Sequence, residues 1–163
     1  VNYLLQVAHI VEILNEVKAK ILVTVSLDDA TELGKKVHQI IEQVPSLEHL
    51  ILLDARLPEV NNKNIIITDF YSAIATQSDQ RLAQSFQPNS DDIAMYFHTG
   101  GTTGRPKIAK LSHDNISFVV QVYAGFNTYH GKSPVLNALP LFHVFGVIAA
   151  SLSMFIVGRT VVI

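Results

Sequence analysis

One glycine- and threonine-rich segment decides the fold class of this chain: Thr99-Gly100-Gly101-Thr102-Thr103-Gly104-Arg105-Pro106-Lys107. Its glycines allow positive φ angles and let another group approach the backbone closely. Successive N–H groups in such a loop form a concavity that binds anions. The threonines add hydroxyl donors, Lys107 adds a positive charge, and Pro106 fixes φ at the exit. The segment therefore predicts a loop that binds polyphosphate.

The loop differs from two well-known nucleotide-binding motifs. A Walker A loop has its lysine directly after the last glycine, whereas Arg105 and Pro106 separate Gly104 from Lys107. The glycines also do not follow the G-x-G-x-x-G spacing of a dinucleotide site. A plain glycine-threonine hairpin turn stays open as an alternative. That alternative explains the glycines, but neither the paired threonines nor the Pro-Lys ending.

The segments on either side of the loop predict two strands and a helix. Residues 93–98 read as a strand and residues 108–111 as the returning strand. Ser112, Asp114 or Asn115 can cap a helix that runs to about Phe126. The sequence beyond predicts a strand over residues 135–139, a buried helix over residues 144–157 and the start of a strand over residues 159–163.

The first part of the chain predicts a βαβ unit. After an amphipathic helix, residues 19–25 form an apolar, β-branched run that is typical of a buried strand. Asp28 or Asp29 can cap a second helix, which ends near Pro45. Residues 49–54 then predict a second strand. Strand, helix and strand in this order are typical of a right-handed unit with a parallel sheet.

These patterns predict an α/β fold with a parallel or mixed sheet flanked by helices. We divide the chain into a βαβ-type subdomain (1–75), a connecting loop (76–90) and a segment that carries the phosphate loop (91–163). Residues 65–67 form a short apolar run, and Asp69 is expected to cap a short helix after it. Residues 76–90 are polar and aperiodic. The chain stops inside an apolar run, which we interpret as a truncation.

Composition excludes several classes of function. A net charge of −2 with scattered charges gives no electrostatic basis for binding nucleic acid or an anionic membrane. The absence of cysteine excludes disulfides and thiolate metal sites and fits a cytoplasmic location. The seven histidines lack zinc-ligand spacing, so we expect no metal site formed by histidines in this chain.

No membrane span is expected either. The apolar stretch 144–158 would form a helix of about 22 Å, short of the bilayer's hydrocarbon core of about 30 Å. Since 48% of the residues are hydrophobic and only 16% are charged, we expect apolar surface that faces the missing remainder of the chain or supports self-association.

The loop and its surroundings resemble the adenylate-forming superfamily of acyl-CoA synthetases, luciferases and peptide-synthetase adenylation domains. The phosphate loop of that superfamily reads roughly [ST]-[SG]-G-[ST]-T-G-x-P-K and is followed by S-H-x-N. Both motifs are present here, the second as Ser112-His113-Asp114-Asn115. A further segment, Pro140-Leu141-Phe142-His143, looks like the P-L-F-H segment of acyl-CoA synthetases. Gly100 stands where many members have serine, and Ile108-Ala109 where Gly-Val is common.

The resemblance implies a two-step reaction. A carboxylic acid, with a fatty acid as the expected substrate, reacts with ATP to give an acyl-adenylate and pyrophosphate, and coenzyme A then captures the acyl group. Mg²⁺ would share the phosphate charge. The residues expected to bind phosphate are Thr99, Gly100, Gly101, Thr102, Thr103, Gly104 and Lys107.

The resemblance also implies roles for histidines. It places His143 near the acyl and adenylate pocket, and a core histidine with one satisfied hydrogen bond stays open as the alternative. His113 is expected to serve mainly in opening a helix, and His98 is a further candidate for contact with phosphate.

The resemblance further implies that the chain is an incomplete piece of the large N-terminal domain, with the C-terminal domain absent. The segments that bind adenine and ribose and supply the catalytic lysine lie outside it, so we expect the isolated chain to be inactive. Two alternatives stay open: an adenylation domain that loads a carrier protein or an amino acid, and a non-catalytic domain that binds nucleotide or another chain.

Overall fold

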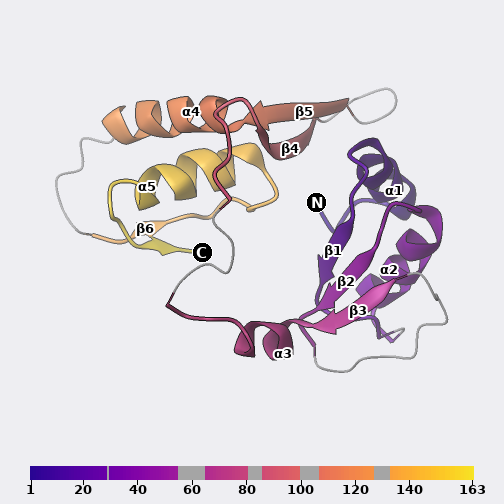
Figure 1. Cartoon of the computed structure of the whole chain (residues 1–163). Coiled ribbons are helices and arrows are strands. Elements are labelled where there is room, and N and C mark those ends of the chain that lie inside the picture. The colour runs from indigo at the N-terminus through magenta and orange to yellow at the C-terminus, as the bar shows by residue number, and fades with distance from the viewer. Residues whose placement is uncertain (29, 55–64, 81–85, 100–106, 127–132) are drawn as a thin grey trace. The chain divides into compact units, whose positions relative to one another are not determined.

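The structure is a computed structural model that describes residues 1–28, 30–54, 65–80, 86–99, 107–126 and 133–163 (Figure 1). These residues form two compact units. The first comprises the described residues of Val1–Phe86, and the second comprises those of Gln87–Gly100 and Lys107–Ile163. Among the described residues, the first unit has one sheet, the second has two, and each unit has its own buried core.

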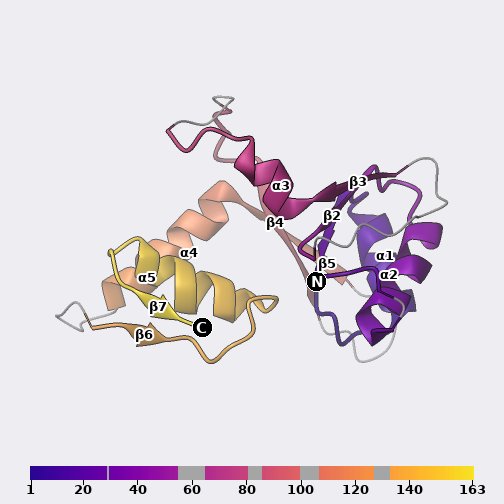
Figure 2. The same cartoon turned by 90° about the horizontal axis from the view of Figure 1, so that it is seen from below.

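The first unit is built on a three-stranded parallel sheet in the order β1-β2-β3. In the register, Leu22 lies beside Leu50, and Leu50 lies beside Ile67. Two helices, α1 and α2, lie on the same face of this sheet (Figures 1 and 2). The elements are α1 (Val7–Glu16), β1 (Ile21–Thr24), α2 (Glu32–Gln43), β2 (His49–Leu52), β3 (Ile66–Asp69) and α3 (Phe70–Ala75). The parallel βαβ arrangement predicted from the sequence is confirmed, and β3 extends it.

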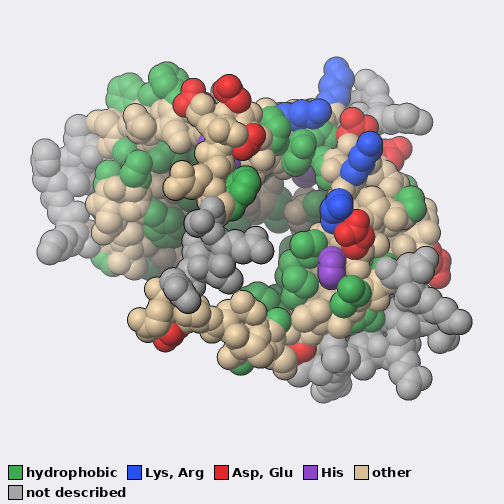
Figure 3. Space-filling view, in the orientation of Figure 1, with side chains coloured by type: hydrophobic (Ala, Val, Ile, Leu, Met, Phe, Trp, Pro, Cys, Tyr) green, Lys and Arg blue, Asp and Glu red, His purple; other side chains and the backbone are tan. Residues whose placement is uncertain are grey.

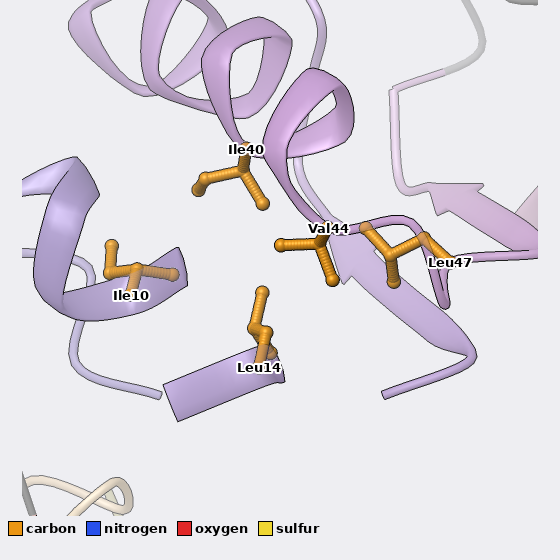
Figure 4. Packing of buried hydrophobic residues seen from close by; sticks show 5 residues of the cluster. All are labelled: Ile10, Leu14, Ile40, Val44 and Leu47. Carbon is orange, nitrogen blue, oxygen red and sulfur yellow. The ribbon is translucent and has the colours of Figure 1, made fainter. Parts of the chain in front are cut away.

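The core of this unit lies between the helices and the sheet. Figure 4 shows side chains from α1 and α2 that point toward one another and toward the turn before β2. Burying each such aliphatic side chain contributes about 1.5–3 kcal/mol. A second cluster joins α2 to the strands. The two clusters consist of Ile10, Leu14, Ile40, Val44 and Leu47, and of Leu27, Val37, Ile41, Leu50 and Leu52.

The cap of α2 corrects the sequence prediction. Thr31 is the N-cap, and its Oγ1 accepts a hydrogen bond of 2.9 Å from the Gly34 N–H. Asp28 instead forms the turn before the helix, because its Oδ1 accepts from the Ala30 N–H and its carbonyl accepts from the Thr31 hydroxyl. Asp29 lies outside the described residues. The predicted cap of α3 is confirmed, since Asp69 Oδ1 accepts from the Ser72 N–H at 2.7 Å.

The second unit combines an antiparallel pair of strands with helices and a short parallel pair. β4 pairs antiparallel with β5, and β6 pairs parallel with β7. Ile116 and Val120 of α4 are buried against Ile148 of η1. The elements are β4 (Ile93–Thr99), β5 (Lys107–Ser112), α4 (His113–Phe126), β6 (Val135–Leu136), the π-helix η1 (Phe145–Leu152), α5 (Ser153–Phe155) and β7 (Val161–Val162).

Two predictions for this unit need correction. The strand expected over residues 135–139 ends at Leu136, because Asn137 turns inward to bond with the helix that follows. The helix expected over residues 144–157 divides into η1 and α5, and it is buried on one face only. Val144, Phe145 and Phe155 are exposed. Among the described residues, no helix has both the length and the apolar character needed to cross a bilayer.

Candidate functional site

The two ends of the glycine-threonine segment lie side by side. Thr99, the last residue of β4, is paired in register with Lys107, the first residue of β5. The Thr99 hydroxyl donates a hydrogen bond of 3.3 Å to the Lys107 carbonyl. The segment therefore connects two adjacent antiparallel strands. Five of its predicted phosphate ligands lie outside the described residues: Gly100, Gly101, Thr102, Thr103 and Gly104. Their contacts stay a prediction.

The side chains at this end of the hairpin can meet an anion. Thr99 and Lys107 are both exposed, and Lys110 is exposed further along β5. Figure 3 shows Lys and Arg side chains at the surface over β5. Alternation along a strand puts Lys107 and Lys110 on opposite faces of the hairpin. His98, paired in register with Ile108, is half-buried. Among the residues that the structure describes, only Lys107 thus combines a charge with a place at the end of the loop.

The S-H-x-N segment builds the start of α4. The Ser112 hydroxyl accepts from the Asn115 N–H at 3.2 Å, and Asn115 Oδ1 accepts from the Ser112 N–H at 3.2 Å. This reciprocal pair satisfies two backbone donors in the manner of a capping box. The His113 N–H donates to the Asp92 carbonyl at 3.1 Å. Of the three predicted caps, Ser112 and Asn115 therefore act together, and the segment has a structural role.

His143 is exposed at the entrance to η1, so its interpretation as a core histidine is wrong. The ring Nδ1 of His143 accepts a hydrogen bond from the backbone N–H of Phe145 at 3.2 Å. The backbone N–H of His143 donates to the Pro140 carbonyl at 3.0 Å. A ring whose Nδ1 accepts carries its proton on Nε2 when neutral. Among the described residues, no hydrogen bond links His143 to Thr99 or Lys107. Of the predicted site residues that lie in the described ranges, the structure thus brings together Thr99 and Lys107.

An apolar cavity of about 260 Å³ lies between α4 and η1. One of its lining residues, Val144, directly follows His143 in the sequence. The rings of Tyr123 and Phe145 meet edge to face at its wall, with centroids 5.8 Å apart. The lining residues are Leu111, Asn115, Val119, Tyr123, Val144, Phe145, Ile148 and Ala149.

Sequence reasoning missed this cavity because it treated residues 144–157 as core. One signal could have indicated it. Asn115, Val119 and Tyr123 recur every four residues, as do Val144 and Ile148, so each set lies along one face of its helix.

Comparisons with known proteins identify the family. The family described as AMP-binding enzyme matches residues 1–163. Marinolic acid–CoA ligase of Pseudoalteromonas sp. (strain SANK 73390) is 31% identical over 163 residues, which cover 97% of this chain and 24% of the ligase. A long-chain-fatty-acid–CoA ligase of Bacillus subtilis (strain 168) is 33% identical over 90 residues, which cover 54% of this chain and 16% of that protein.

A solved structure has the same fold. The anthranilate CoA ligase AuaEII, in complex with anthranoyl-AMP, matches with a TM-score of 0.81 at 22% identity, over 100% of this chain and 29% of that one. The chain thus spans 24% of the length of the marinolic acid–CoA ligase and 29% of the length of the anthranilate CoA ligase. The α/β fold expected for part of an N-terminal domain is confirmed. Since the family match extends over the whole chain, this chain belongs to the AMP-binding enzyme family.

Proposed function

We propose that the full-length protein is an ATP-dependent, AMP-forming acid–CoA ligase that acts on a fatty acid. The observation that carries the proposal is the pairing of Thr99 with Lys107 at the two ends of the glycine-threonine segment. The pairing sets a hydroxyl and an ammonium group side by side at the ends of the segment, which supports a role for both beside the triphosphate of ATP. Membership of the AMP-binding enzyme family supports the same reaction.

In the first step, a carboxylate oxygen of the acid bonds to the α-phosphorus of ATP. The bond from that phosphorus to the bridging oxygen breaks, and pyrophosphate leaves with the electron pair. Charge grows on the leaving group, so fixed donors and positive charges beside it lower the barrier. Lys107 and Thr99 would supply them at the loop ends. Mg²⁺ prefers oxygen ligands, so phosphate oxygens and the Thr99 hydroxyl would suit it.

His143 would act on the acyl group. Because its Nδ1 already accepts from the Phe145 N–H, its Nε2–H is the donor left for a ligand. That donor could bond to an oxygen of the carboxylate or of the adenylate. In the second step, the sulfur of coenzyme A bonds to the acyl carbon. The bond from that carbon to the phosphate oxygen breaks, and AMP leaves with this oxygen and the electron pair.

The cavity between α4 and η1 supports an apolar acid as the substrate. Six of its eight lining residues are aliphatic or phenyl side chains, and one of them, Val144, directly follows His143 in the sequence. Apolar lining favours an aliphatic chain, because burying each CH₂ group contributes about 0.8 kcal/mol. The likeness to a long-chain-fatty-acid–CoA ligase points the same way.

The test compares two lysines on one strand. We expect Lys107→Ala in the full-length protein to lower fatty-acid-dependent pyrophosphate release about 10²- to 10³-fold, as removal of one charge-stabilising donor does in other enzymes. Lys110→Ala is the matched control, since Lys110 lies on the opposite face of the hairpin, and it should keep near-normal activity.

Equal activity of the two lysine variants would show that Lys107 takes no part in the reaction. It would support the alternative of a non-catalytic domain that binds nucleotide or another chain. Assays with acids of different length and with coenzyme A or a carrier protein as acceptor test the substrate and the acceptor separately.

A further inference from the structure

Asn137 is a buried polar residue with a fully engaged carboxamide. It directly follows β6, and its side chain is only 3% exposed. Its Nδ2 donates to the Gly146 carbonyl and to the Ser151 hydroxyl, both at 2.9 Å. Its Oδ1 accepts from the Leu139 N–H at 3.0 Å. A buried carboxamide is retained at such a site only where its hydrogen bonds are made, so these contacts fix its orientation.

These bonds hold both ends of the segment that contains His143. Leu139 lies just before Pro140, and Gly146 lies three residues after His143. One side chain therefore joins the beginning of the turn to the first turn of η1. The backbone N–H of Asn137 is itself bonded to the Val162 carbonyl at 2.8 Å, which ties the side chain to the β6–β7 pair.

The turn that contains His143 lies directly against the first turn of η1. A Cβ atom added to Gly146 would be 2.4 Å from the Pro140 carbonyl oxygen, so the two backbones are in contact at this point. Between these anchors, the bonds of His143 within the described part of the chain are local, to Pro140, Phe145 and Val147. Because the Asn137 side chain bonds to both Leu139 and Gly146, it fixes the separation of these two residues. The position of the His143 ring between them consequently depends on Asn137.

We propose that Asn137 is a positioning residue that holds the His143 ring in place for adenylate formation. The inference rests on the proposed function. It requires a carboxamide, because the site uses two donors and one acceptor from the same planar group. Aspartate keeps the acceptor but loses both donors, and alanine loses all three.

The test uses Asn137→Ala, with Ser151→Ala as a matched control, in the full-length enzyme. Ser151→Ala removes one partner of Asn137 and leaves a buried N–H unpaired, but the bonds to Leu139 and Gly146 remain. We expect Asn137→Ala to lower kcat for pyrophosphate release about tenfold to hundredfold, as loss of alignment does, with KM for ATP nearly unchanged. Ser151→Ala should keep kcat within about twofold while lowering Tm.

A double-mutant cycle with His143→Ala separates positioning from general damage. If Asn137 acts through His143, the double variant is no slower than His143→Ala alone. In wild-type enzyme with ¹⁵N-labelled histidine, the NMR signals of His143 should show a single tautomer with the proton on Nε2. Asn137→Ala should shift this ring toward a mixture of tautomers, because the bond from Phe145 is no longer held.

The outcomes distinguish the two proposals. Additive losses in the cycle, or an unchanged His143 tautomer in Asn137→Ala, overturn the positioning role and leave the proposed function intact. Wild-type activity in His143→Ala overturns the role of His143 and the positioning role together. Absence of adenylate formation with every acid tested overturns the proposed function itself.

Discussion

At the scale of single residues, the phosphate loop is predicted from one contiguous segment, whereas the surroundings of His143 involve residues farther along the chain. The glycine-threonine segment is contiguous, so its composition alone indicated a phosphate loop, and the structure adds that Thr99 and Lys107 are register partners. The setting of His143 depends on Asn137, which is six residues away, and on Gly146 beyond it. No local pattern reports such contacts. The exposure of the histidine was therefore not predictable from its apolar neighbours.

Gly146 gives a prediction at this scale. Gly146→Ala should lower the free energy of unfolding by about 1–3 kcal/mol, as overpacking typically does, because the new methyl group would meet the Pro140 carbonyl. Gly125→Ala is the matched control. A Cβ atom at Gly125 meets nothing within 4 Å, and alanine favours a helix by about 0.5–1 kcal/mol. Urea denaturation of the full-length variants checks both signs, and a stable Gly146→Ala protein would show that the turn can move away.

At the scale of elements, the strand and helix periods predicted most of the fold, and the exceptions have physical causes. The sequence marks β3 only by the apolar run of residues 65–67, which is shorter than the runs that predict β1 and β2 and too short to separate a strand from an apolar turn. The N-cap of α2 is Thr31 and not Asp28, because the Asp28 side chain accepts a hydrogen bond within the preceding turn. η1 is a π-helix, whose hydrogen bonds span five residues where those of an α-helix span four. The apolar run of residues 144–157 does not distinguish these two kinds of helix.

The cap of α3 predicts a dependence on pH. The side chain and the backbone N–H of Ser72 both bond to the Asp69 carboxylate and lower its pKa below the ordinary value of 3.8. Since the folded pKa is lower than the unfolded one, the cap stabilises α3 above pH 3.8 and loses that contribution as the pH falls through the folded pKa. NMR titration of the Asp69 carboxyl should give a midpoint below 3.8. Ser72→Ala should raise this midpoint, and a wild-type midpoint of 3.8 or higher would contradict the assignment.

At the scale of the whole molecule, the described residues form two units, each with its own core. Both units expose large apolar side chains. Ile21 and Val23 are more than half exposed on β1, although parallel sheets are normally covered on both faces. Phe118 and Phe126 are exposed along α4, and Figure 3 shows hydrophobic side chains at the surface over this helix. This surface fits the expectation of further contacts, either with more of the same chain or with another copy.

The isolated chain provides a prediction at this scale. It spans 24% of a full-length relative, and the family's adenine, ribose and catalytic-lysine segments are expected outside it. We therefore expect no carboxylate-dependent pyrophosphate release from residues 1–163 alone, in an assay that detects the full-length enzyme at a thousandth of its rate. Turnover close to that of the full-length enzyme would show that the described loop ends and cavity suffice for catalysis.

The pairing of β6 with β7 has a consequence for the order of events during translation. β7 is made some 25 residues after β6, and the Asn137 N–H bonds to Val162. A ribosome that has completed the His143 turn has thus not yet made the strand that secures it. The side-chain bonds of Asn137 can form earlier, but its backbone bond waits for Val162, so this part of the site should mature later than the β4–β5 hairpin, whose partners are close in sequence.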